Sequence, residues 1–139
     1  MIQVNDGTVT PGSSFLVVEA DPGFGKDVSY WLREASIKVI LVNSANEAIQ
    51  LIHDCVAIKC SLDGLLVDYY LRETRGCRVL REFQHEYPGA AVAIMTEEED
   101  ISVNIWANTR AIRILRKPLD EEDIQLWLRE LGLDVPVAV

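Results

Sequence analysis

Apolar segments of strand length alternate with amphipathic segments of helical period along most of this chain. The predicted strands cover residues 15–18, 37–42, 65–68, 91–95 and 112–115. Between them apolar residues recur three or four positions apart, as in Phe24, Val28 and Trp31, which is typical of a helix with one buried face. Five strand-helix units in succession predict an α/β fold with a parallel sheet, because a crossover helix returns the chain to the same end of the sheet.

Polar residues and glycine mark the ends of several predicted helices. Ser44 and Glu47 form a capping-box pattern before the second helix. Asp120 can cap the fifth helix, and Gly132 can end it. The fourth helix, predicted over residues 100–108, has the weakest amphipathic pattern of the five.

The character of the strands predicts their order in the sheet. The first, third and fourth are continuous apolar runs, as expected of strands covered on both faces. The second and fifth carry Lys38 and Arg113, as edge strands tend to. These features favour a doubly wound, flavodoxin-like sheet with strand order 2-1-3-4-5. We expect one domain over residues 14–132, a flexible leader over 1–13 and a C-terminal tail over 133–139.

Composition excludes several classes of function. The chain has 139 residues and a net charge of −9, which argues against a direct nucleic-acid partner and against binding to anionic membranes. No apolar run approaches the roughly 20 residues of a membrane helix, and the N-terminus shows no signal-peptide pattern. Cys55, Cys60 and Cys77 form no CxxC pair, so we expect reduced thiols in a cytoplasmic protein.

Four of the predicted strands run into residues that can handle a phosphoryl group. The first leads to Glu19 and the third to Asp68, whereas the fourth leads to Thr96 and the fifth to Lys117. Because the carboxyl ends of parallel strands converge on one crevice, two carboxylates, a hydroxyl and an ammonium group should meet there. An ionised aspartate can attack phosphorus, and Mg²⁺ binds carboxylate and phosphate oxygens. The set therefore predicts a site for a divalent cation and a phosphoryl group.

The ordered set continues with Gly76, eight residues after Asp68, and with Pro118 directly after Lys117. Over about residues 14–132 the sequence resembles the receiver domains of two-component response regulators, the CheY-like domains. The resemblance implies structural roles for Gly76 and Pro118, with a cis peptide bond before the proline. It also implies that the domain is no enzyme beyond its own phosphoryl transfer and hydrolysis.

The resemblance implies a role for each residue of the site. Asp68 would be the phosphoacceptor. Thr96 and Lys117 would contact phosphoryl oxygens. Mg²⁺ would bind to Glu19, Asp68 and the backbone carbonyl of Tyr70.

The resemblance also implies partners. A histidine kinase or a phosphotransfer protein would supply the phosphoryl group in a phosphorelay. Output would pass to a partner protein, or to a second copy of the chain, through the predicted fourth helix, fifth strand and fifth helix. The weak amphipathic pattern of that fourth helix, which includes Trp106, is typical of a surface that moves or contacts a partner.

Four positions depart from the family pattern. Ala20 stands where a second acidic metal ligand is usual, so Mg²⁺ should bind weakly. Arg72 replaces a proline, and Glu97 replaces a small residue after the threonine. Ile114 replaces the aromatic residue that usually accompanies movement of the threonine.

Two interpretations of the sequence remain open. In one the chain is a phosphoacceptor with weakened Mg²⁺ binding, which the retained aspartate, threonine and lysine favour. In the other it is a phosphorylation-independent pseudo-receiver that acts as a protein-interaction module. A nucleotide-binding enzyme is disfavoured, since residues 23–26 hint at a phosphate loop but Val28 stands where a dinucleotide-binding pattern needs glycine. A dehalogenase-type phosphatase would need a second aspartate where Tyr70 stands.

Overall fold

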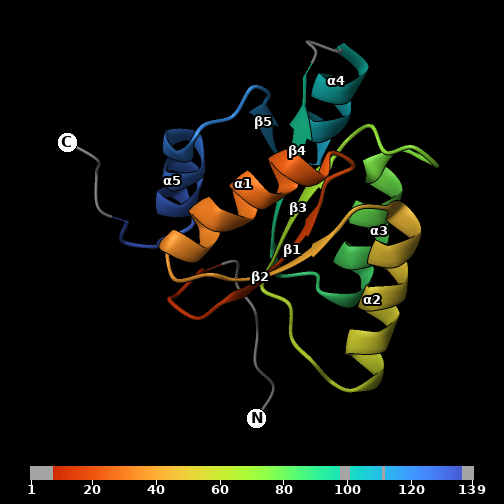
Figure 1. The fold of residues 1–139 in the computed structure, drawn as a ribbon. Coiled ribbons are helices and arrows are strands. Elements are labelled where there is room, and N and C mark those ends of the chain that lie inside the picture. Colours follow the sequence, from red (N-terminus) through yellow and green to blue (C-terminus); the bar gives the residue numbers. More distant parts are fainter. Residues whose placement is uncertain (1–7, 98–100, 111, 136–139) are drawn as a thin grey trace.

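A single five-stranded parallel sheet organises the chain (Figure 1). The computed structural model describes residues 8–97, 101–110 and 112–135. The strands are β1 (Ser14–Val18), β2 (Lys38–Val42), β3 (Gly64–Asp68), β4 (Ala91–Thr96) and β5 (Arg113–Arg116). The helices are α1 (Pro22–Glu34), α2 (Ala45–Ala57), α3 (Gly76–Glu86), α4 (Ile101–Thr109) and α5 (Glu121–Glu130). The strand order is β2-β1-β3-β4-β5, which confirms the predicted fold class and order.

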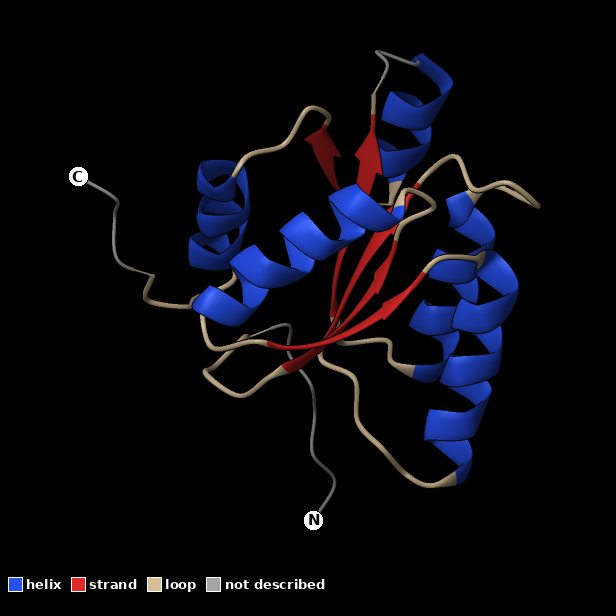
Figure 2. Cartoon of the chain, viewed as in Figure 1, coloured by secondary structure: helices blue, strands red, loops and turns tan. Residues whose placement is uncertain are grey.

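Helices cover both faces of the sheet, with α1 and α5 on one side and α2 and α3 on the other (Figure 2). Alternate residues of β1 point to opposite sides, as a pleated strand requires. Phe15 and Val17 lie in the core beneath α1 and α5, where the Phe15 ring meets Trp127 edge-on at 5.5 Å. Leu16 and Val18 lie in the core beneath α2 and α3, to which Ala107 of α4 also belongs. Two apolar cores therefore hold the sheet in place.

Burial along the strands explains why the order was predictable. All five residues of β3 are buried, whereas β2 has only exposed and half-buried positions, and both end residues of β5 are exposed. Lys38 and Arg113 are exposed on these two edges. β5 begins one residue later than predicted, at Arg113. Asp100, which the prediction placed in the fourth helix, lies outside the described residues.

Helix ends follow the predicted caps with one correction. Asp120 and Asp123 form a complete capping box at α5, and Gly132 ends the helix at a φ of +92°. Ser44 accepts from the Glu47 amide as predicted. The return bond from the Glu47 side chain does not form among the described residues. Instead the loop before α3 brings in Glu73, whose carboxylate accepts from the Ala45 amide at 2.7 Å.

The described parts of both flanks pack against the domain. Val9, within the predicted flexible leader, is 1% exposed, and its amide donates to the Leu131 carbonyl at 3.1 Å. Leu133 and Val135, within the predicted tail, are buried in the same core. The core therefore extends beyond residues 14 and 132, because single apolar residues outside any strand or helix pack against it. Within the described chain, no helix is long and apolar enough to span a bilayer.

Gly76 lies against the backbone of the residue that ends β3. A Cβ atom at position 76 would lie 2.0 Å from the Asp68 carbonyl oxygen, far inside van der Waals contact. The Gly76 amide also donates to the Tyr69 carbonyl at 2.6 Å. This close approach accounts for the structural role that the sequence predicts for Gly76.

We expect Gly76→Ala to lower the free energy of unfolding by about 2 kcal/mol or more, because backbone must shift to admit the methyl group. Gly23→Ala is the matched control, since its Cβ would meet only the Asp21 carboxylate at 3.5 Å. Urea unfolding followed by circular dichroism measures both variants. Equal stability of the two variants would contradict the account of Gly76.

Candidate functional site

The predicted site residues gather at the carboxyl end of the sheet. Glu19 follows β1, Asp68 ends β3, Thr96 ends β4 and Lys117 follows β5. An open cavity of about 870 Å³ lies at this end of the sheet. Its walls are Glu19, Ala20, Asp21, Pro22, Phe24, Asp68, Arg72, Glu97, Lys117 and Pro118. The peptide bond between Lys117 and Pro118 is cis, as predicted.

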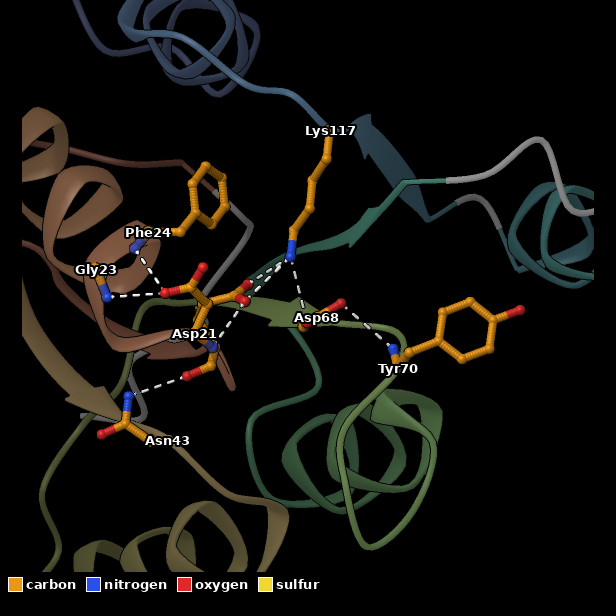
Figure 3. Close-up of polar contacts among 8 residues, drawn as sticks. Asp21, Gly23, Phe24, Asn43, Asp68, Tyr70 and Lys117 are labelled. Atoms are coloured by element: carbon orange, nitrogen blue, oxygen red, sulfur yellow. Dashed lines mark hydrogen bonds and ion pairs between the residues drawn. The ribbon is translucent and has the colours of Figure 1, made fainter.

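A buried ion cluster forms the floor of this cavity (Figure 3). The Lys117 ammonium lies 2.9 Å from Glu19 Oε2 and 3.0 Å from Glu19 Oε1. The same ammonium lies 3.3 Å from Asp68 Oδ2. Glu19 is 1% exposed and Asp68 is 7% exposed. One cation therefore neutralises one of two buried carboxylates, and the cluster keeps a net negative charge.

Burial sets the electrostatics of the cluster. Burial raises the pKa of Glu19, and the nearby Asp68 charge raises it further, while the Lys117 hydrogen bond opposes both effects. Burial also lowers the pKa of Lys117, but the hydrogen bond that Lys117 donates to Glu19 and the charges of both carboxylates outweigh it and raise that pKa on balance. Lys117 is therefore held firmly in its charged form. Glu19, with one shared cation, is the least satisfied member of the cluster.

Thr96 carries a buried hydroxyl at the end of β4. The residue is 1% exposed, and among the described residues Oγ1 has no hydrogen-bond partner. An unpaired buried hydroxyl costs roughly 1–3 kcal/mol. The backbone carbonyl of Thr96 accepts from the Lys117 amide at 2.8 Å, so the two predicted phosphoryl contacts lie on neighbouring strand ends. A ligand oxygen would satisfy the hydroxyl.

Asp21 does not take the place of the missing second acid at Ala20. Its carboxylate caps α1 and accepts from the amides of Gly23 at 3.0 Å and Phe24 at 3.4 Å (Figure 3). Its own amide donates to Glu19 Oε1 at 3.2 Å. Asp21 thus starts the helix and holds the Glu19 side chain, so the site has two carboxylates on its floor rather than three.

Two residues that the sequence analysis did not single out for the site also support it. Asn43, after β2, donates from its side chain to the Glu19 carbonyl at 3.0 Å and fixes the end of β1. Phe24 lines the cavity, and its ring centre lies 4.9 Å from the Lys117 ammonium. Such a cation-π contact helps to keep the lysine over the carboxylates. The predicted sheet order could have placed Asn43 beside β1. The helical pattern that includes Phe24 indicates only a core residue of that helix.

The positions that depart from the family pattern differ in their distance from the site. Arg72 and Glu97 both line the cavity, so each adds a charge to its walls. Ile114 is half-buried in β5 and packs against the core under α2 and α3. It adds no ring to the cavity wall.

The carboxylate oxygens on the cavity floor suit a hard cation. Glu19 and Asp68 already converge on one ammonium group, so both carboxylates reach a common point. The Tyr70 amide donates to Asp68 Oδ1 at 3.3 Å, which holds the Tyr70 backbone beside the carboxylate. No group of three or more His, Cys, Asp or Glu side chains in the described residues could hold a metal ion. The carboxylates of Glu19 and Asp68 fit Mg²⁺, because that ion is often held by only one or two protein carboxylates.

Comparison with solved structures shows the same fold in many bacterial proteins. A response regulator receiver domain protein from Clostridium thermocellum matches with a TM-score of 0.74 at 22% identity, over 86% of this chain and 93% of that one. The chemotaxis response regulator CheY4 of Vibrio cholerae matches with a TM-score of 0.72 at 19% identity, over 86% and 98%. The receiver domain of the hybrid histidine kinase CckA matches with a TM-score of 0.69 at 16% identity, over 86% and 98%.

Comparison at the level of sequence gives the family. No curated protein sequence matches the chain significantly. The family model for the response regulator receiver domain matches residues 15–129, a span that contains all four strand-end residues of the site. The chain therefore belongs to the response regulator receiver domain family of two-component signalling.

Proposed function

We propose that the chain is a phosphoacceptor in a phosphorelay, with Asp68 receiving a phosphoryl group from a histidine kinase or a phosphotransfer protein. The observation that carries this proposal is the buried cluster of Asp68, Glu19 and Lys117 at the strand ends. The unpartnered hydroxyl of Thr96 at the next strand end supports it. A phosphoryl oxygen bound at this strand end would give that hydroxyl a partner.

The residues divide the work of phosphoryl transfer between them. A carboxylate oxygen of Asp68 forms a bond to phosphorus as the bond from phosphorus to the donor nitrogen breaks, and the donor leaves with that electron pair. Lys117, 3.3 Å from Asp68, can then pair with a phosphoryl oxygen. Thr96 can donate its hydroxyl proton to another. Catalysis of this kind rests on positioning and charge neutralisation, and the fold supplies both.

Receiver domains generally bind Mg²⁺ at the phosphorylation site. Here Glu19, Asp68 and the backbone carbonyl of Tyr70 would hold the ion. When bound it would supply positive charge against the incoming phosphoryl group. We propose that binding is weak, because Ala20 supplies no oxygen and Asp21 is used to cap α1.

A second candidate function is the pseudo-receiver that docks partners without phosphorylation. It is supported by Arg72 and Glu97, which add opposite charges to the cavity wall at positions where the family usually has uncharged residues. It is also supported by Lys117, whose ammonium already pairs with both carboxylates in the absence of metal. The retained acceptor, hydroxyl and lysine favour the phosphoacceptor, and the two candidates differ in whether Asp68 takes up phosphate.

The proposed output surface consists of α4, β5 and α5. Trp106 of α4 is half-buried, and the guanidinium of Arg110 stacks over its ring at 5.0 Å. Leu126 of α5 is 45% exposed, a large apolar side chain on the outer face of its helix. Aromatic and arginine side chains of this kind are enriched at protein interfaces.

We expect incubation with acetyl phosphate and Mg²⁺ to add one phosphate to the protein, and Asp68→Asn to abolish the addition because the amide cannot act as the nucleophile. Intact-protein mass spectrometry measures the adduct. Asp21→Asn is the matched control, because asparagine also caps helices and Asp21 lies at the same cavity. Absence of any adduct at millimolar Mg²⁺ would favour the pseudo-receiver.

We expect Ala20→Asp to tighten Mg²⁺ binding at least ~10-fold, about 1.4 kcal/mol, because it restores an anionic oxygen ligand. The same change should lower the stability of the metal-free protein by adding a like charge beside Glu19 and Asp68. Isothermal titration calorimetry and thermal melting without metal measure the two effects. Ala20→Asn, which adds similar bulk without charge, should show neither tightening nor comparable repulsion. Unchanged Mg²⁺ affinity in the aspartate variant would show that the site is closed to the ion.

We expect phosphorylation to change amide hydrogen exchange within α4, β5 and α5, because these elements follow the strand ends that carry Thr96 and Lys117. Exchange measured by mass spectrometry with and without acetyl phosphate tests this, with α2 as the internal reference. Changes confined to segments outside residues 101–131 would contradict the proposed output surface.

A further inference from the structure

Four arginines lie within ten residues at the start of α3, in a chain with 13 basic and 22 acidic residues. They are Arg72, Arg75, Arg78 and Arg81, and all four are exposed. Together they are called the arginine stripe. The stripe concentrates positive charge in one region of an otherwise acidic protein.

The fold places the stripe along one edge of the molecule. Arg72 lines the cavity that contains Asp68, and Arg75 is the residue just before α3. Arg78 and Arg81 follow on the outer face of the helix, where they border a depression of about 460 Å³ together with Glu82 and His85. The opposite face of α3 is buried through Val79, Leu80 and Phe83. Figure 1 shows α3 beside α2, on the far side of the sheet from α5.

No carboxylate among the described residues neutralises the arginines of the stripe. None of the four arginines forms an ion pair with a carboxylate among the residues that the structure describes. Arg113, by contrast, pairs with Glu130 at 2.9 Å. Glu82 follows Arg78 by four residues, a spacing that favours an ion pair on a helix. Its carboxylate instead lies 3.7 Å from His53 of α2, which leaves Arg78 available.

Two aromatic residues, Tyr69 and Tyr70, lie beside Arg75 of the stripe. The guanidinium of Arg75 stacks over the Tyr70 ring at 4.6 Å and lies 5.7 Å from the Tyr69 ring centre. Tyr70 is 39% exposed, so its ring is partly available to a partner. Tyrosine and arginine are the residue types that most often carry binding energy at protein interfaces. Stacking also restricts the arginine before binding, which lowers the entropy lost on association.

We propose that the arginine stripe is a docking surface for an acidic segment of a partner protein. Charge complementarity identifies the occupant, since each unpaired guanidinium can bind a carboxylate through two hydrogen bonds. A net charge of −9 disfavours a nucleic acid, which the whole protein would repel. The surface is separate from α4, β5 and α5, and the proposal does not depend on whether Asp68 is phosphorylated.

A fluorescein-labelled oligoglutamate peptide serves as the probe, with binding measured by fluorescence anisotropy on the whole chain. We expect saturable binding that weakens as salt increases. The variant R78E/R81E should weaken it at least about tenfold. The matched control is K26E/K38E, which makes the same change in net charge, from −9 to −13 (two substitutions of −2 each), at exposed sites in α1 and β2. The control should retain binding within about twofold of the wild-type affinity.

Three results would overturn the proposal. The first is no binding of oligoglutamate at low salt. The second is equal weakening in K26E/K38E, which would mean that overall charge rather than the stripe governs binding. The third is tighter, stripe-dependent binding of a single-stranded oligonucleotide, which would make the occupant a nucleic acid. Circular dichroism of both variants checks that each remains folded, as expected for exposed positions.

Discussion

The buried contact of Lys117 with Glu19 and Asp68 is the interaction on which the site depends. Two carboxylates taken out of water are costly unless a cation accompanies them. The cation comes from β5, a sheet edge, while the carboxylates come from β1 and β3 near its middle. In a parallel sheet with the order β2-β1-β3-β4-β5, the carboxyl ends of these strands lie at one end of the sheet. The ion cluster therefore depends on the fold.

The cluster also explains the consequences of losing one acid. With alanine at position 20, one ammonium meets two carboxylates instead of three, and the metal-free floor comes closer to neutrality. The remaining imbalance rests on Glu19, whose pKa is raised by burial. Arg72 adds a positive charge to the cavity wall and Glu97 a negative one. We propose that a site of this kind attracts a divalent cation less strongly, while Asp68, Thr96 and Lys117 remain in place for phosphoryl transfer.

Much of this could be predicted from the sequence because its strongest signals are local. Continuous apolar runs marked the inner strands, charged residues marked the edges, and parallel topology then fixed where Asp68 and Thr96 must meet. What could not be predicted depends on contacts between distant segments. Glu73 caps α2 from another loop, and Asn43 fixes the end of β1 from the neighbouring strand. Val9 joins the core from a polar stretch that gave no periodic pattern.

The proposed function requires that the cavity bind a phosphoryl group at Asp68. Titration with beryllofluoride, a phosphoryl analogue, in the presence of Mg²⁺ tests this requirement, with ¹⁹F NMR as the readout. We expect slow-exchange fluorine signals from an analogue held on Asp68, and we expect these signals to disappear when Mg²⁺ is chelated. Bound signals should also be absent from the Lys117→Met variant, in which no ammonium remains to contact the analogue. If only the signals of free beryllofluoride are seen at saturating Mg²⁺, the phosphoacceptor proposal is wrong. The domain would then be the pseudo-receiver, a protein-interaction module.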